Sequence, residues 1–321
     1  MRLLGRFVCV SLVCLLGPGS SDGQDRDASP EGLNQAGGVY LESERAFLTF
    51  GGYRSDGSGP TDRAWIFHDG AWTELHGSTA PPPRGSHSMV SLGDRAMVFG
   101  GYHSGQRLDD AWLFDGQEWS ELKAQGPEGC SSHAMAYDPA RGHVVLFGGK
   151  TTSGLAGDTW VYTDSGWNRL DIDGPAPRWH HAMAYDPVRR GVLLFGGRTD
   201  DGFTSETWLF DGARWIELDL AETPTPRDHH AMTTDTAHDR VLVFGGWDGN
   251  DELGDLWEWD GRSWNRIDID GDGGPGARGG HPVLYFDAHT RRPMLYGGAR
   301  DGEFFSDLWM LGEHAWELVH P

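Results

Sequence analysis

The hydrophobic pattern of the chain is organised around a short apolar run that ends in two glycines and is followed by two tryptophans. In its clearest form the run Val192 to Phe195 leads into Gly196-Gly197, and Trp208 and Trp215 follow. The unit occurs six times, at Gly51-Gly52, Gly100-Gly101, Gly148-Gly149, Gly196-Gly197, Gly245-Gly246 and Gly297-Gly298. These pairs are 48 to 52 residues apart. A fixed period of this length indicates a repeat architecture and outranks any local interpretation.

Each unit is predicted to form four short strands. In the fourth unit these are His181–Tyr185, Gly191–Phe195, Thr207–Phe210 and Trp215–Leu218. The second strand is apolar on both faces, so it is expected to be buried on both sides. Asp-Pro and Asp-Gly turn signals separate the strands. Six such units predict an all-β fold, a six-bladed β-propeller with four antiparallel strands per blade.

The two tryptophans stand seven residues apart in every unit, so the repeat accounts for twelve of the fifteen tryptophans. Together with the Pro177-Arg178-Trp179-His180-His181 lead-in, this pattern resembles the kelch repeat family, including its secreted bacterial-type members and the central domain of galactose oxidase. The resemblance covers residues 37–320. Kelch domains serve as binding modules, enzyme scaffolds and adaptors, so the family constrains function weakly.

Three regions are predicted along the chain. Residues 1–21 have two arginines, an apolar stretch ten residues long from Phe7 to Leu16, and a small-residue end, which is the layout of a secretory signal peptide. Residues 22–36 are polar and are interpreted as a flexible linker. The propeller is predicted over residues 37–321, with blades at 37–75, 83–122, 129–170, 177–218, 226–267 and 277–319.

The signal peptide predicts a secreted or periplasmic protein, and anchoring as a lipoprotein through Cys14 is the alternative. Cleavage would leave Cys130 as the single cysteine, so no intrachain disulfide is expected. The formal net charge is −22, which disfavours nucleic acid as a partner. No membrane span is predicted, and the protein is expected to be a monomer.

The first and last units determine how the ring closes. Each unit holds all of its own strands, so closure is expected to rest on packing of the sixth blade against the first. Counting back from Gly51 places Gln35 and Gly38 where other units carry the lead-in arginine and histidine. In the third unit Cys130 replaces that arginine.

Topology places the candidate site without any motif. In an up-and-down blade the lead-in to the first strand and the loop between the second and third strands lie at the same rim, so they should converge on one face around the channel. The lead-in histidines, His281 among them, belong to this face. The residues predicted to bind a ligand there are Arg84, Lys150, Arg178, Trp179, His180, Arg198, Arg227, His229, Trp247, Arg278 and Arg300.

A cationic mouth edged with aromatic rings suits an anionic or polyol ligand, because arginine forks bind carboxylates and aromatic faces stack on sugars. The alternative for the repeated arginines and histidines is a structural role within the blade. The arginines would then pair with acids such as Asp110, Asp158, Asp255 or Asp307, and the histidines would bond to a neighbouring backbone.

The sequence shows no metal-binding motif, so neither a metal ligand nor a cofactor is predicted. Calcium is the alternative, at residues 268–273 or at Asp248, Asn250 and Asp251. The first stretch lacks the twelfth-position glutamate of an EF-hand, where Gly279 stands. The histidines lack His-x-His spacing, and a zinc or copper centre built across blades stays open.

The predicted function is a secreted binding module for a carbohydrate or protein partner, and catalytic residues are unknown. The alternative is an enzyme on the same face. The resemblance to secreted six-bladed kelch proteins would imply a sialate-type epimerase, with Glu206 and Glu252 as loop carboxylates. A copper oxidase resembling galactose oxidase is a weaker match, because that enzyme has seven units and further domains.

Overall fold

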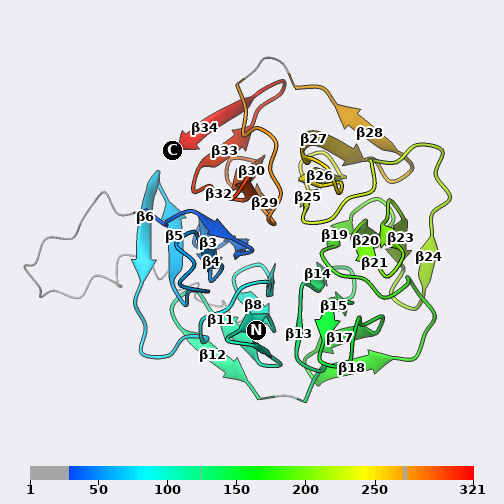
Figure 1. The fold of residues 1–321 in the computed structure, drawn as a ribbon, viewed down its shortest axis with the longest axis horizontal. Coiled ribbons are helices and arrows are strands. Elements are labelled where there is room, and N and C mark those ends of the chain that lie inside the picture. The colour runs from blue at the N-terminus through cyan, green and yellow to red at the C-terminus, as the bar shows by residue number, and fades with distance from the viewer. Residues whose placement is uncertain (1–28, 124, 270–272) are drawn as a thin grey trace, which may run out of the picture.

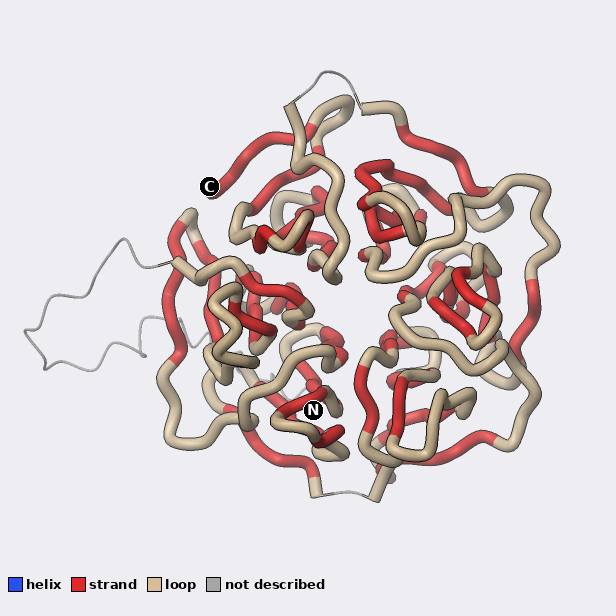
Figure 2. The backbone as a smooth tube through the Cα atoms, viewed as in Figure 1, coloured by secondary structure: helices blue, strands red, loops and turns tan. Residues whose placement is uncertain are grey.

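The computed structural model describes residues 29–123, 125–269 and 273–321. In these ranges the chain forms six four-stranded antiparallel sheets around a central channel, and it contains no helix (Figure 1, Figure 2). The predicted six-bladed propeller is therefore confirmed. No helix that is long and apolar enough to span a membrane occurs in the described part of the chain. The expected signal peptide and residues 22–28 of the expected linker lie outside the described residues.

Each blade consists of four strands that follow one another from the channel outwards. Blade 1 contains β2 (Gly37–Leu41), β3 (Ala46–Phe50), β5 (Ala64–His68) and β6 (Ala71–Leu75). Blade 2 contains β7 (Ser88–Ser91), β8 (Ala96–Phe99), β11 (Ala111–Phe114) and β12 (Trp119–Leu122). Blade 3 contains β14 (Ala134–Asp138), β15 (His143–Phe147), β17 (Thr159–Thr163) and β18 (Gly166–Leu170).

The second half of the ring repeats this order. Blade 4 contains β19 (Ala182–Asp186), β20 (Gly191–Phe195), β23 (Thr207–Phe210) and β24 (Trp215–Glu217). Blade 5 contains β25 (Ala231–Asp235), β26 (Arg240–Trp247), β27 (Glu252–Trp259) and β28 (Trp264–Ile267). Blade 6 contains β29 (Val283–Asp287), β30 (Arg292–Tyr296), β33 (Leu308–Leu311) and β34 (Trp316–His320).

Two-residue strands extend five of the blades beyond their glycine pairs. They form the antiparallel pairs β1 (Leu33–Asn34) with β4 (Tyr53–Arg54), β9 (Tyr102–His103) with β10 (Gln106–Arg107), β13 (Cys130–Ser131) with β16 (Lys150–Thr151), β21 (Arg198–Thr199) with β22 (Gly202–Phe203), and β31 (Ala299–Arg300) with β32 (Glu303–Phe304). In blade 5 the strand does not stop at its glycines, because β26 continues through a bulge between Phe244 and Gly246 to Trp247.

The strand register places the lead-ins and the loops after the glycine pairs on one face. The start of β19 at Ala182 pairs with the end of β20 at Phe195. Beyond that pair, Trp179 of the lead-in bridges Arg198 after the glycines. Equivalent bridges join the lead-in to the residue after the glycines in blades 2, 5 and 6. The predicted convergence is thus confirmed, and this face is called the mouth face below.

The glycine pairs are required where this face meets the next strand. Gly196 and Gly197 have φ values of 67° and 92°, in the left-handed region that side chains rarely adopt. A Cβ at Gly197 would lie 2.7 Å from the Cβ of His181. The pair therefore allows a close approach of the two backbones at the channel.

Neighbouring blades are joined by one repeated aromatic contact. The second tryptophan of each unit packs against the aromatic residue before the glycine pair of the preceding blade, as in Trp215 with Phe147, whose centroids are 5.4 Å apart. Ring closure uses the same contact, because Trp72 of blade 1 lies 5.2 Å from Tyr296 of blade 6. The sheets are not interleaved, so closure rests on packing as expected.

The first blade corrects two sequence assignments. Register shows that Leu33 and Ala36, and not Gln35 and Gly38, take the places of the lead-in arginine and histidine. Counting back from Gly51 gave the wrong residues because it assumed the spacing of blade 2, in which the hairpin of the first two strands is two residues shorter. The ordered blade also begins before residue 37, since Leu33 is buried and lies in β1.

Candidate functional site

The four lead-in arginines of the predicted site are buried. The guanidinium group of Arg84 binds both carboxylate oxygens of Asp110, at 2.8 and 2.6 Å, and donates to the carbonyl of Gly100 at 2.9 Å. The corresponding pairs are Arg178 with Glu206, Arg227 with Asp255 and Arg278 with Asp307. The side chains of these arginines are at most 2% exposed, so they hold their own blades together rather than face a ligand.

The same carboxylates also hold the first tryptophan of each of these blades. Asp255 accepts the indole N–H of Trp257 at 2.7 Å, beside its two bonds from Arg227. Burial raises the pKa of Asp255, but the bonds and charge of Arg227 outweigh it, and the net shift is downward. The carboxylate therefore stays ionised in the folded protein.

Two blades lack this clamp. In blade 1 Leu33 stands in the place of the arginine and Arg63 in the place of the acid. The buried cation is thus lost together with the carboxylate that would pair with it. In blade 3 Cys130 replaces the arginine, and Asp158 pairs instead with the exposed Arg169. The sequence prediction that Asp158 pairs with a lead-in arginine is therefore wrong, and Glu206 is the fourth acid.

The lead-in histidines fall into two sets with different surroundings. The first set occupies the position directly before the inner strand and comprises His87, His133, His181 and His230. These rings are buried edge-on against the aromatic residue of the preceding blade, as in His87 with Phe50 at 5.5 Å between centroids. Burial lowers the pKa of His87, His133 and His230 to about 3, so they are neutral.

The second set lies one residue earlier and forms part of a closed backbone ring. His180, His229 and His281 all have left-handed φ values near 55°. The N–H of each lead-in residue at this position donates to the preceding blade, which gives a chain of hydrogen bonds around the channel. The other three positions of this ring are Gln35, Ser86 and Ser132.

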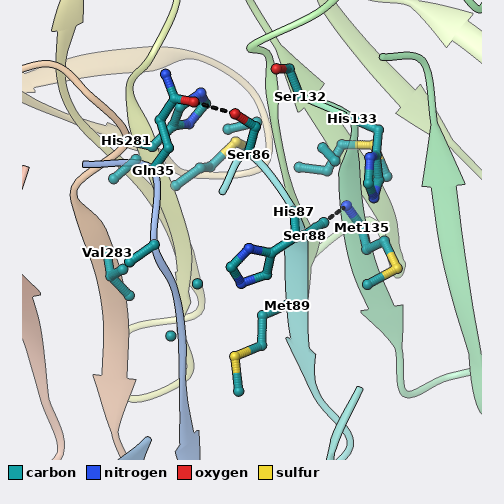
Figure 3. Close-up of a pocket in the computed structure, with 18 of the residues that line it drawn as sticks. Gln35, Ser86, His87, Ser88, Met89, Ser132, His133, Met135, His281 and Val283 are labelled. Atoms are coloured by element: carbon teal, nitrogen blue, oxygen red, sulfur yellow. Dashed lines mark hydrogen bonds between the residues drawn. The ribbon is translucent and has the colours of Figure 1, made fainter. Parts of the chain in front are cut away.

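The three histidines of the ring converge on one another. The Nδ1 of His180 lies 2.6 Å from the Nε2 of His281. One ring nitrogen from each of His180, His229 and His281 lies within 4.8 Å of the others. The opposite part of the ring is also polar, since the hydroxyl of Ser86 donates to the Oε1 of Gln35 (Figure 3). The six side chains at these ring positions are called the axial ring below: Gln35, Ser86, Ser132, His180, His229 and His281.

A cavity of about 160 Å³ continues from the axial ring into the channel. Figure 3 shows Gln35 and Ser132 at one end of it, with His87 and Met89 further along the strands. A second cavity of about 490 Å³ follows, lined by the later part of the inner strands, including Tyr137 and Tyr185. The channel is therefore polar near the mouth face and more apolar further in.

Beside the axial ring, the mouth face carries a cluster of cations around one tryptophan. The Nζ of Lys150 lies over the ring of Trp179, and the guanidinium carbon of Arg198 lies 5.9 Å from the same centroid. Arg107 is close enough to lower the pKa of Lys150 by repulsion. Arg107 was not predicted, although it is a basic residue between the glycine pair and the first tryptophan of its unit, where it lies in β10. Lys150, Trp179, Arg198 and Arg107 are called the cationic patch.

The two remaining predicted residues are outside this patch, although Trp247 adjoins it through Phe203, whose centroid lies 5.1 Å from the guanidinium carbon of Arg198. Trp247 packs edge-on against Phe203, with centroids 5.3 Å apart. Arg300 is exposed and lies 6.0 Å from the centroid of Phe305. The eleven predicted residues are thus divided among a buried clamp, the axial ring, the cationic patch and these two outer positions.

The structure gives little information on the two alternative calcium sites. Asp270, Gly271 and Asp272 of the first calcium loop lie outside the described residues. In the second loop, the Oδ1 of Asp248 accepts the backbone N–H groups of Asn250 and Asp251. Calcium binding therefore stays an alternative.

Glu206, one of the two loop carboxylates of the epimerase alternative, is held in the buried clamp. Burial raises the pKa of Glu206, but the hydrogen bonds from Arg178 and Trp208 together lower it by more, so the net shift of the pKa is downward. The pKa of Cys130 is raised by burial to about 12, and its Sγ lies 3.3 Å from the Nδ1 of His133. A protonated, buried thiol is a poor nucleophile, so Cys130 is assigned to the core.

Comparison with known proteins gives the family. The KLHDC2/KLHL20/DRC7 Kelch-repeats domain matches residues 25–174 and 140–320. The chain therefore belongs to the kelch-repeat β-propeller family, and such a propeller suggests a protein-binding module.

One curated relative shows a local similarity. The dynein alpha chain of the flagellar outer arm from Chlamydomonas reinhardtii is 41% identical over 58 residues, which is 17% of this chain and 1% of that protein. The chain thus spans about one hundredth of the length of this relative. The similarity is little longer than one repeat and adds nothing about function.

Proposed function

We propose that this protein is a binding module that captures a protein partner on its mouth face by binding carboxylate groups at the cationic patch. The observation that carries the proposal is the grouping of Lys150 and Arg198 around Trp179, with Arg107 close enough to repel Lys150. Among the described residues, none of these three cations forms an ion pair. This distinguishes them from the buried lead-in arginines, whose charges are already matched.

The electrostatics of Lys150 favour an incoming anion. Burial lowers its pKa first, repulsion from Arg107 and Arg198 lowers it further, and the charge of Asp228 offsets only part of this. A carboxylate that approaches the three cations offsets this repulsion and accepts their hydrogen bonds. Arg198 supplies the planar fork that matches a carboxylate, and Trp179 supplies a flat apolar surface beside it.

The overall charge indicates the kind of anion. With a formal net charge of −22, the protein repels an extended polyanion over most of its surface. A short segment with one or two carboxylates meets the local cations without bringing much negative charge close. An acidic peptide segment fits this description. An acidic sugar carries the same group, and the experiment below separates the two.

Residues 1–21 support the further proposal that the protein acts outside the cytoplasm, because they have the layout of a secretory signal. Mass spectrometry of the protein from its native host tests this directly. A mature N-terminus near Ser21 is expected, and an intact Met1 in the bulk of the protein would contradict it.

Fluorescence polarisation with a set of labelled peptides tests the binding proposal. The peptides carry glutamate at varied positions, and each has a glutamine counterpart. Saturable binding of a subset of the glutamate peptides is expected. Lys150→Glu should abolish it, whereas Lys123→Glu, at the only other lysine of the chain, should not. Equal binding of both peptide forms would overturn the proposal, and selective binding of uronic or sialic acids would move it to carbohydrate.

A further inference from the structure

We propose that His180, His229 and His281 form a binding site for a divalent transition metal of the zinc, cobalt, nickel and copper group. The site lies on the channel axis at the mouth face, and it takes one ligand from each of blades 4, 5 and 6. It is a separate proposal from carboxylate binding by the cationic patch.

Geometry provides the first argument. One nitrogen from each ring lies within 4.8 Å of the others, and the closest two are 2.6 Å apart. Tetrahedral zinc with Zn–N bonds of 2.0–2.1 Å holds its ligand nitrogens about 3.3 Å apart. Metal binding would therefore require each nitrogen to shift by roughly 1 Å from its place in the structure.

The repeat itself shows that the blade does not require these histidines. Blades 2 and 3 carry Ser86 and Ser132 at the same ring position, with the same left-handed backbone. Their φ values of 55° and 59° match the 54° of His180. Serine therefore satisfies the backbone at this position. Histidine occurs only in three consecutive blades, where its ring can meet the other two.

A carboxylate orients one of the three rings as metal sites require. The Nδ1 of His229 lies 2.7 Å from the Oδ1 of Asp228, whose side chain is 2% exposed. A carboxylate only accepts hydrogen bonds, so Nδ1 carries the proton and Nε2 has a lone pair. The amide nitrogen of Gln35 lies 3.5 Å from this Nε2, and a metal ion would replace that contact. Metal-bound histidines commonly donate their second nitrogen to a carboxylate in this way.

The type of the donors selects the metal. Neutral imidazole is the form that binds a metal, and it suits zinc, copper, nickel and iron better than calcium or magnesium. Three protein ligands leave a further coordination position for water or another ligand.

Cobalt titration of the tag-free protein, after treatment with a chelator and desalting, tests the site. Binding of one Co²⁺ per chain is expected, with the visible absorption of a tetrahedral ion, and Zn²⁺ should displace it. His180→Ser, His229→Ser and His281→Ser should each weaken Co²⁺ binding about tenfold or more. Asp228→Asn should weaken it by about 10- to 100-fold.

The serine variants copy residues that blades 2 and 3 already carry, so they are expected to fold, and circular dichroism checks this. His289→Ser, at an exposed histidine outside the ring, is the matched control and should bind Co²⁺ as the wild type does. Failure of the wild type to bind one Co²⁺ per chain would overturn the proposal. Unchanged binding in all three ring variants would overturn it as well.

Discussion

The Nδ1 of His180 and the Nε2 of His281 lie 2.6 Å apart, although 101 positions separate the two residues. They belong to blades 4 and 6, and the ring of His229 lies 3.6 Å, centroid to centroid, from that of His180. The contact exists because the blades curve around a narrow axis, where the residues that begin the inner strands face one another. The groups on the mouth face are thus brought together by the closed ring and not by any local motif.

Ring closure should therefore contribute as much stability as any other blade contact. Trp72→Ala removes the closing contact with Tyr296, and Trp215→Ala removes its equivalent with Phe147. Each is expected to lower the free energy of unfolding by about 3–5 kcal/mol, since both delete a buried tryptophan. Urea unfolding measures both. A much smaller effect for Trp72→Ala would show that the ring does not depend on packing between blades 6 and 1.

The buried clamp gives a second prediction. Arg227→Leu leaves Asp255 half-enclosed without its partner and should cost about 3–5 kcal/mol of unfolding free energy. The triple variant Arg227→Leu, Asp255→Arg, Arg266→Glu copies Leu33, Arg63 and the Glu74 that pairs with Arg63 in blade 1, and it should cost less than the single change. Urea midpoints compare the two proteins. A triple variant that is less stable than Arg227→Leu alone would contradict the interpretation.

The architecture was predictable from the sequence because the same structural signals recur in each of the six units. The seven-residue tryptophan interval and the glycine pairs recur in every unit, so six imperfect copies reinforce one another. Comparison of the six units did not reveal where single blades depart from the common pattern. Blade 1 was misaligned by the shorter hairpin of blade 2, and nothing in the linear pattern around Gly245-Gly246 showed that β26 would continue to Trp247.

The buried histidines predict how stability depends on pH. The pKa of His87 is about 3 in the folded protein, against its ordinary value of 6.5. Below pH 6.5 the unfolded chain binds a proton that the folded protein does not. Stability from this group is therefore present above pH 6.5 and is lost as the pH falls towards 3, by about 1.4 kcal/mol per pH unit.

Urea midpoints between pH 7.5 and 5 measure this loss, in a window above the titration of most carboxylates. The wild type should lose stability steadily below pH 6.5. His87→Ala, which copies Ala36 of blade 1, should lose it less steeply, whatever its stability at pH 7.5. Equal slopes for the two proteins would mean that His87 is protonated in the folded state.

The cationic patch predicts an unusual lysine. Lys150 lies over the face of Trp179, and its pKa is lowered from 10.5 by burial and by Arg107 and Arg198. After reductive methylation with ¹³C, which keeps the charge, its signal should be shifted upfield by the indole ring and should titrate below pH 10.5. Lys150→Arg assigns it, since only one other lysine, Lys123, is present. A signal without ring-current shift would place Lys150 away from Trp179.

The residue types of the site were predictable, but their division was not. The sequence correctly predicted that the arginines, histidines and Trp179 lie on one face. The four lead-in arginines are nevertheless buried in ion pairs, and among the predicted arginines only Arg198 belongs to the patch. Adjacent histidines such as His180 and His181 look alike in the sequence. One faces the axis and the other is buried between blades, and a single step along the strand makes that difference.

The labelled lysines also give the most direct test of the account. The protein with ¹³C-methylated lysines is titrated with a glutamate peptide selected by polarisation, and both lysine signals are followed by NMR. The account predicts that the Lys150 signal moves saturably with the peptide, that the Lys123 signal stays in place, and that the glutamine counterpart moves neither. A peptide that binds while Lys150 does not respond would show that carboxylate recognition takes place elsewhere on the propeller.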